Sequence, residues 1–149
     1  MMKKSLLLLA LMILLPSFAM AKPDGATAKS VLDYYLTGSE VVLLEHNFCS
    51  SIQDTECINP LDPQTVANGA EAFLWMNFMV PKPVVSNLFI QFQRKGRTLL
   101  TSEVTMKDSI GYRTWIPLPT DKSGAWKVVV EQEKSQGYEG VTTLDYTVN

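Results

Sequence analysis

The chain has 149 residues, of which 46% are hydrophobic, and a formal net charge of −2 at pH 7. This length holds one ordinary domain with a sizeable core. With 13 Lys and Arg against 15 Asp and Glu, the chain has no basic surplus for binding phosphate backbones or anionic lipid surfaces. We therefore expect no nucleic acid partner.

The first 21 residues match a secretory signal peptide. Lys3 and Lys4 form a basic start, residues 6–15 are almost wholly apolar, and Ala19-Met20-Ala21 is a small-x-small cleavage site. A membrane anchor is the alternative, but about 10 to 15 apolar residues are too few to span a bilayer comfortably. Cleavage before Lys22 leaves 11 basic and 15 acidic residues, a net charge of −4, and no membrane span. The mature protein is predicted to be periplasmic or secreted.

A short helix is predicted as a possible element of the N-terminal lead, residues 22–38. The apolar side chains recur at helical spacing up to Gly38, which would end the helix. Tyr34-Tyr35-Leu36 would also suit a strand, so that alternative stays open. The recurring residues are Ala28, Val31, Leu32, Tyr35 and Leu36.

Cys49 and Cys57 are the two cysteines, and an exported chain is expected to join them in a disulfide. Such a bond would contribute about 2–3 kcal/mol by restricting the unfolded chain. The alternative is a redox or metal-binding pair. It is disfavoured because the spacing is not Cys-x-x-Cys and because His46, the single histidine, has no second nitrogen ligand. We predict no metal site and no cofactor.

Residues 39–149 are predicted to form the single domain, a mainly β structure. Apolar and polar residues alternate in short runs between turn signals, which is typical of antiparallel strands. Residues 54–69 contain three turn dipeptides and are predicted to be irregular. Residues 72–80 are apolar on both alternating faces, which predicts a central strand covered on both sides. The expected strands are 39–50, 72–80, 88–93, 100–106, 110–116, 125–131 and 143–148.

These roughly seven strands favour an antiparallel β-sandwich of immunoglobulin-like type, with a small closed barrel as the alternative. Trp126, Val128 and Val130 fall on one face of an extended chain, so Trp126 is predicted to lie in the core. Leu144 and Tyr146 are expected to share that interior. The basic turn between 94 and 97 is predicted to be a solvated hairpin tip.

Arg113 and Trp115 are the best candidates for a binding site. They alternate with Tyr112, Thr114 and Ile116, so if the latter point inward the two stand side by side outside. There they could stack as a cation–aromatic pair with each other or with a ligand. The alternatives are that Trp115 points inward with Arg113 at the rim, or that the pair covers the sheet without binding anything.

The chain resembles the uncharacterised bacterial exported domain family DUF2914 over residues 40–148. The resemblance rests on the run from Phe48 to Asp54, the aromatic strand 73–78, Tyr112-Arg113-Thr114-Trp115, and Gly124-Ala125-Trp126-Lys127-Val128. Where that family has a His-Arg-Trp-like segment before the basic turn, this chain has Phe89-Ile90-Gln91-Phe92. The resemblance implies a fold and an envelope setting, and it supplies no reaction.

Three classes of function remain open. The first is a non-catalytic envelope module that binds a protein or glycan partner. The second is a structural or assembly accessory that pairs through an exposed sheet edge. The third, a hydrolase-type enzyme, would need acid–base groups such as Glu45, His46, Glu71 or Glu103, but the sequence contains no nucleophile elbow, metal triad or spaced acidic pair. We therefore predict no catalytic residues.

Overall fold

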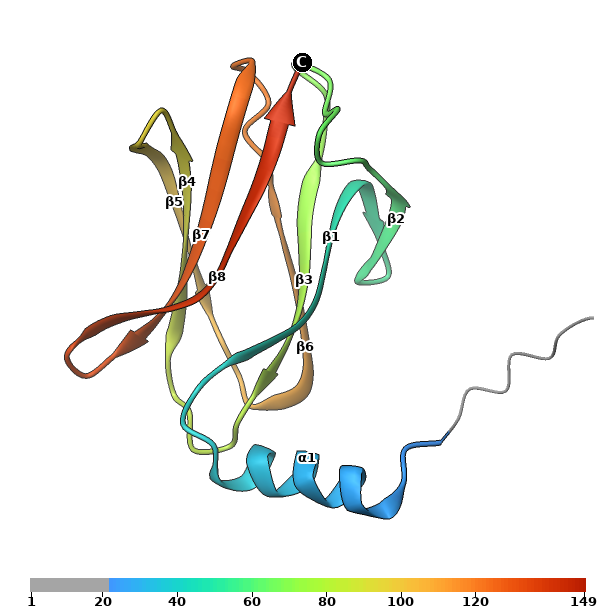
Figure 1. Cartoon of the computed structure of the whole chain (residues 1–149), viewed down its shortest axis with the longest axis vertical. Helices are drawn as coiled ribbons and strands as arrows, with labels where there is room; N and C mark the ends of the chain where they lie inside the picture. The colour runs from blue at the N-terminus through green and yellow to red at the C-terminus, as the bar shows by residue number, and fades with distance from the viewer. Residues whose placement is uncertain (1–21) are drawn as a thin grey trace, which may run out of the picture.

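The computed structural model describes residues 22–149, so the predicted signal peptide lies outside the described residues. Two four-stranded antiparallel sheets pack as a sandwich, preceded by the helix α1 (Gly25–Thr37) (Figure 1). One sheet has the order β2-β1-β3-β6 and the other β5-β4-β7-β8. The predicted mainly β fold and N-terminal helix are confirmed. The strands are β1 (Val42–Gln53), β2 (Glu56–Pro60), β3 (Phe73–Val80), β4 (Asn87–Arg94), β5 (Arg97–Thr105), β6 (Ser109–Pro117), β7 (Gly124–Lys134) and β8 (Gly137–Val148).

The structure has eight strands rather than about seven because β2 lies in the segment predicted to be irregular. That prediction is wrong for Glu56–Pro60, where the chain reverses after Gln53 and pairs back onto β1. Pairing with β1 gives the backbone N–H and C=O groups of this segment hydrogen-bond partners, so a segment rich in turn residues still forms a strand. Without β2, a three-stranded sheet β1-β3-β6 faces the sheet β5-β4-β7-β8, which is an immunoglobulin-like arrangement.

The core lies between the two sheets and follows the predicted alternation. On β3, Leu74, Met76 and Phe78 point inward and are fully buried, and Trp75 on the opposite face is also buried. The prediction that β3 is covered on both sides is therefore confirmed. Trp126 packs in the same core, which confirms its predicted place. The interior is completed by Leu88, Ile90, Phe92, Val128, Val130, Tyr146 and Val148, with Leu144 packed against it.

The second half of the segment predicted to be irregular protects the edge of β8. Val66 forms a parallel bridge with Val148. The Val66 N–H donates to Thr147 O (3.1 Å), and the Asn149 N–H donates back to Val66 O (2.9 Å). This segment therefore covers one end of a sheet edge that would otherwise expose unpaired backbone groups.

Four of the strands contain β-bulges, whereas the short edge strand β2 pairs with β1 without one. Relative to their partners, β1, β5 and β8 each contain one extra residue, namely Leu44, Leu99 and Val141. In β6, Ile110 and Gly111 together stand opposite a single residue of β3. Leu44, Leu99 and Ile110 are about half exposed because a bulge turns a side chain out of the regular alternation.

The helix α1 lies across one end of the sandwich and is attached mainly by its last turn (Figure 1). The Tyr35 hydroxyl donates to Asp108 Oδ2 (2.7 Å), and the Lys82 N–H donates to Tyr35 O (2.7 Å). Gly38 ends the helix as predicted, and a Cβ there would lie 2.6 Å from Tyr34 O, so only glycine fits. No residue of α1 is buried. No helix within residues 22–149 is long and apolar enough to cross a membrane.

Candidate functional site

The candidate site is the face of the β2-β1-β3-β6 sheet that points away from the core, here called the outer face. Antiparallel register places Trp115 of β6 beside Trp75 of β3, and Arg113 beside Asn77. Asn47 of β1 lies on the other side of Trp75. The outer face therefore carries an aromatic row, with a row of polar side chains next to it.

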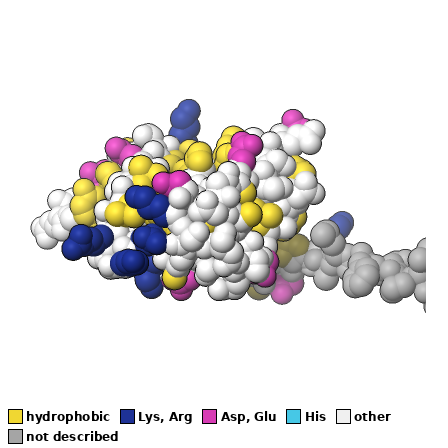
Figure 2. Space-filling model, turned by 90° about the horizontal axis from the view of Figure 1, so that it is seen from above, with side chains coloured by type: hydrophobic (Ala, Val, Ile, Leu, Met, Phe, Trp, Pro, Cys, Tyr) yellow, Lys and Arg dark blue, Asp and Glu magenta, His cyan; other side chains and the backbone are white. Residues whose placement is uncertain are grey.

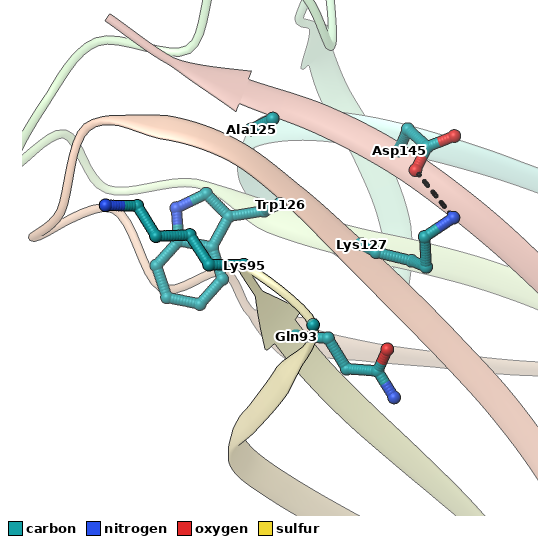
Figure 3. A pocket seen from close by; sticks show the side chains of 7 residues that line it. Gln93, Lys95, Ala125, Trp126, Lys127 and Asp145 are labelled. Atoms are coloured by element: carbon teal, nitrogen blue, oxygen red, sulfur yellow. Dashed lines mark ion pairs between the residues drawn. The ribbon is translucent and has the colours of Figure 1, made fainter.

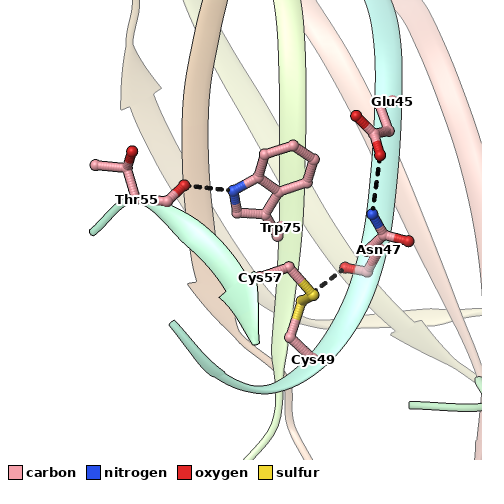
Figure 4. Close-up of a disulfide and its surroundings, with 6 residues drawn as sticks. All are labelled: Glu45, Asn47, Cys49, Thr55, Cys57 and Trp75. Atoms are coloured by element: carbon pink, nitrogen blue, oxygen red, sulfur yellow. Dashed lines mark hydrogen bonds between the residues drawn. A yellow bond between two sulfur atoms is a disulfide. The ribbon is translucent and has the colours of Figure 1, made fainter. Parts of the chain in front are cut away.

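The β1–β2 hairpin folds over the outer face and covers Trp75. The Trp75 Nε1–H donates to Thr55 O at the hairpin tip (2.8 Å), which leaves only 3% of Trp75 exposed (Figure 4). The predicted disulfide is present within this hairpin and joins Cys49 of β1 to Cys57 of β2, with 5.6 Å between their Cα atoms. The two strands of the hairpin are thus held together by a covalent bond, and its tip is fixed by an indole hydrogen bond.

Arg113 adds a third attachment. Its Nη1 forms an ion pair with Glu56 Oε1 on β2, and the two side chains are each 46% exposed. An exposed pair of this kind typically contributes about 0–1 kcal/mol, so its main effect is to set the position of the hairpin. Arg113 therefore reaches towards the hairpin, while Trp115 stays 39% exposed. Of the two orientations that the sequence pattern left open for Trp115, the structure has the outward one.

The hairpin tip has an unusual backbone. Asp54 and Thr55 both have positive φ, 50° and 66°, as a two-residue type I′ turn requires. Thr55 is β-branched, and such residues rarely adopt this conformation because the Cβ substituents crowd the backbone. Backbone strain of this kind clusters at functional sites, where the surrounding structure holds it in place.

Thr55→Gly should relieve that strain and raise the free energy of unfolding by about 0.5–1 kcal/mol. The bond from Trp75 is made to the main-chain oxygen, so it persists in the variant. Urea denaturation of the mature protein measures the change. Thr101→Gly, at an exposed strand position without positive φ, is the matched control and should destabilise. Equal destabilisation by both changes would contradict strain at Thr55.

The sequence identified only part of this site. Arg113 and Trp115 do share the outward side of β6, but Trp75, Thr55 and Glu56 were not predicted to join them. The available signal was the pair Asp54-Thr55, which lies between the two halves of the disulfide loop. Two residues are the length of a tight hairpin turn. Nothing in the sequence pairs Arg113 with Glu56, 57 residues away.

The candidate acid–base groups are not brought together. Glu45 lies on the outer face, whereas the next residue, His46, points to the other side of β1 and meets Phe48 edge-on (ring centroids 6.4 Å apart). Glu103 is on β5 in the other sheet, and Glu71 is exposed before β3 begins. Within residues 22–149, no group of three or more His, Cys, Asp or Glu side chains is placed to hold a metal ion.

A second surface lies at the end of the sandwich that carries the β4–β5 turn, where Lys and Arg side chains gather on one side (Figure 2). A hollow of about 200 Å³ beside the turn is lined by Lys95, Trp126 and the Lys127–Asp145 ion pair (3.5 Å) (Figure 3). Arg94 of this turn is half-buried and donates to Ser123 O, so it is not the solvated residue predicted. Since Trp126 belongs to the core, the outer face is the better candidate.

No family model matches the chain, and no curated protein does. Membership of DUF2914 therefore stays a prediction.

Proposed function

We propose that this protein is an exported, non-catalytic module of the cell envelope that binds a protein or glycan partner through Trp115 on the outer face. One observation carries the proposal. Trp115 keeps 39% of its surface exposed on a sheet whose neighbouring hairpin is fixed by a disulfide, an indole hydrogen bond and an ion pair. A rigid aromatic side chain on a preorganised surface loses little conformational entropy on binding.

Export to the periplasm or beyond is supported by the signal-peptide pattern of the first 21 residues and by the disulfide. Disulfides persist in oxidising compartments and are rare in reducing ones. The resemblance to an exported domain family points in the same direction.

The β-bulges disfavour the alternative of assembly through a sheet edge. The edge strands β5, β6 and β8 each carry one, at or near Leu99, Ile110 and Val141, and β1 carries one at Leu44, where β2 does not cover it. The remaining edge strand, β2, has no bulge but is only five residues long. A bulge kinks an edge and breaks the regular row of donors and acceptors that an added strand would need. Binding through a sheet face needs no open edge, so the bulges are compatible with the proposed site.

Trp115→Ala should remove at least about 90% of the captured partner while leaving the fold intact, because truncating a central exposed Trp typically costs 2 kcal/mol or more of binding. Crosslinking in intact cells with the mature protein, followed by quantitative mass spectrometry, measures the loss. Tyr138→Ala is the matched control, since Tyr138 is 60% exposed on the distant β7–β8 hairpin. Retention of every partner by the Trp115 variant would defeat the site assignment.

A further inference from the structure

We infer that the β1–β2 hairpin is a redox-controlled cover, which the Cys49–Cys57 disulfide holds closed over Trp75 and which opens when that disulfide is reduced. The closed cover hides an indole next to Trp115. It would therefore regulate the site proposed above, and its effect on binding rests on that proposed function. The cover stays closed because the disulfide lies across a bend in the hairpin.

The hairpin bends sharply where it leaves the sheet. β1 pairs with β3 as far as Cys49, and its remaining residues pair with β2. Asn59, on the opposite strand at this point, has a positive φ of 52°. Cys57 stands opposite Ile52, three positions beyond Cys49, and three residues of a straight strand span about 10 Å. The Cα atoms of the two cysteines are only 5.6 Å apart, so the hairpin curls back between them.

The disulfide therefore clamps the bend. It joins the last β1 residue that pairs with β3 to a residue on the part of the hairpin that folds over the outer face (Figure 4). Residues 50–60 are all half-buried or exposed. At the tip they are attached by the bond from Trp75 Nε1–H to Thr55 O and by the exposed Arg113–Glu56 pair. A two-stranded hairpin is marginally stable on its own in water, so without the clamp it should lift from the sheet.

Opening the cover would enlarge the apolar surface around Trp115. Antiparallel register places Trp75 beside Trp115 and Phe73 beside Pro117. In the closed form Trp75 is 3% exposed and Trp115 is 39% exposed. Lifting the hairpin would add the Trp75 indole to this surface, which gives a partner more to bind than Trp115 alone.

The chemical step is exchange with a dithiol oxidoreductase, for which dithiothreitol is the probe. One thiolate of the dithiol attacks Cys57 Sγ, because Cys57 is half-buried whereas Cys49 is fully buried. The S–S bond breaks, and Cys49 leaves as a thiolate that takes up a proton. The second thiol of the dithiol then displaces Cys57, so the dithiol is oxidised to its own disulfide and both cysteines end as thiols. The reverse exchange closes the cover, as an oxidising compartment favours.

Acrylamide quenching tests the cover in mature Trp115→Phe protein, where the remaining indoles, Trp75 and Trp126, are each 3% exposed. Reduction with dithiothreitol should raise the quenching constant at least about threefold, and reoxidation should reverse the change. Hydrogen exchange should become at least about tenfold faster in residues 50–60 and stay slow in β7, because the opening is local.

A displaced disulfide is the matched control. In Cys49→Ala/Cys57→Ala protein, Ser51→Cys and Ile58→Cys would join two directly opposite residues beyond the bend. This bond staples the two strands together but does not clamp the bend. Quenching should therefore stay high in its oxidised form.

Three results of these measurements would overturn the inference. Unchanged quenching on reduction would show that the hairpin stays closed without the clamp. Equally accelerated exchange in β7 would show that the whole fold opens rather than the cover. Low quenching with the displaced disulfide would show that stapling the hairpin is sufficient.

The crosslinking experiment described above tests the effect on binding. Cys49→Ala/Cys57→Ala protein should capture at least about threefold more partner than the wild type, because its open form is more populated. Equal capture despite raised quenching would overturn the regulatory role. If Trp115→Ala loses the partner while reduction leaves quenching unchanged, the proposed function stands and the cover alone fails.

Discussion

Trp126→Ala should lower the free energy of unfolding by about 3–5 kcal/mol, the usual cost of removing a buried Trp. The Trp126 indole is 3% exposed and stacks on Tyr146, with ring centroids 5.9 Å apart and 13° between the planes. Its Nε1–H donates to Lys122 O (2.9 Å), which ties the loop before β7 to the core. Because small domains typically have about 5–15 kcal/mol of stability in total, this loss would leave the protein marginal.

Urea denaturation followed by circular dichroism measures this loss, and Trp126→Phe is the control. Phenylalanine keeps an aromatic ring against Tyr146 and loses the indole hydrogen bond, so we expect it to cost roughly 1–3 kcal/mol less than alanine does. The pKa of the Tyr146 hydroxyl should fall in Trp126→Ala, because burial raises this pKa in the wild type. The same hydroxyl donates to Pro119 O (2.8 Å). A Trp126→Ala protein within about 1 kcal/mol of the wild type would contradict the assignment of this residue to the core.

Replacing both Cys49 and Cys57 with Ala should cost about 2–3 kcal/mol of stability, as expected for opening a loop of this size. The cost falls on the hairpin that covers Trp75, so the variant should also expose that indole. Acrylamide quenching of tryptophan fluorescence should therefore increase below the unfolding transition. As a matched measurement, the wild type is compared with and without dithiothreitol. Reduction should reproduce both the loss of stability and the increase in quenching.

The double alanine variant separates these effects from any action of the reductant, because dithiothreitol should leave it unchanged. Unaltered quenching in the variant would show that the hydrogen bond to Thr55 O and the Glu56–Arg113 ion pair suffice to keep the hairpin in place. Unaltered stability would contradict a structural role for the disulfide.

The sequence predicted those elements whose signal is local. The alternation around Trp126 and the doubly apolar run 72–80 each need only neighbouring residues, and both predictions are confirmed. The disulfide is confirmed for the same reason, since eight positions separate its cysteines. In contrast, β2 was missed because Asn59-Pro60 signals a turn, and only its pairing with β1 overrides that signal.

The candidate site was harder to predict because it depends on contacts between distant segments. The alternation in β6 placed Arg113 and Trp115 on one side, which is correct. It could not show that Glu56 would reach Arg113, or that the hairpin would bury Trp75 and leave Trp115 exposed. Those outcomes follow from the folding of β2 over the sheet, which no local pattern encodes.

The β-bulges in the outermost strands have a consequence for this protein in a crowded compartment. Fibril growth begins when flat, regular strands of neighbouring molecules zip together into a continuous cross-β ladder. Here β5 and β6 carry bulges, at Leu99 and at Ile110, and β8 is partly covered by the segment around Val66. The fourth edge strand, β2, has no bulge but is only five residues long. The folded molecule should therefore stay dispersed at high local concentration, even though apolar side chains remain exposed along its sides.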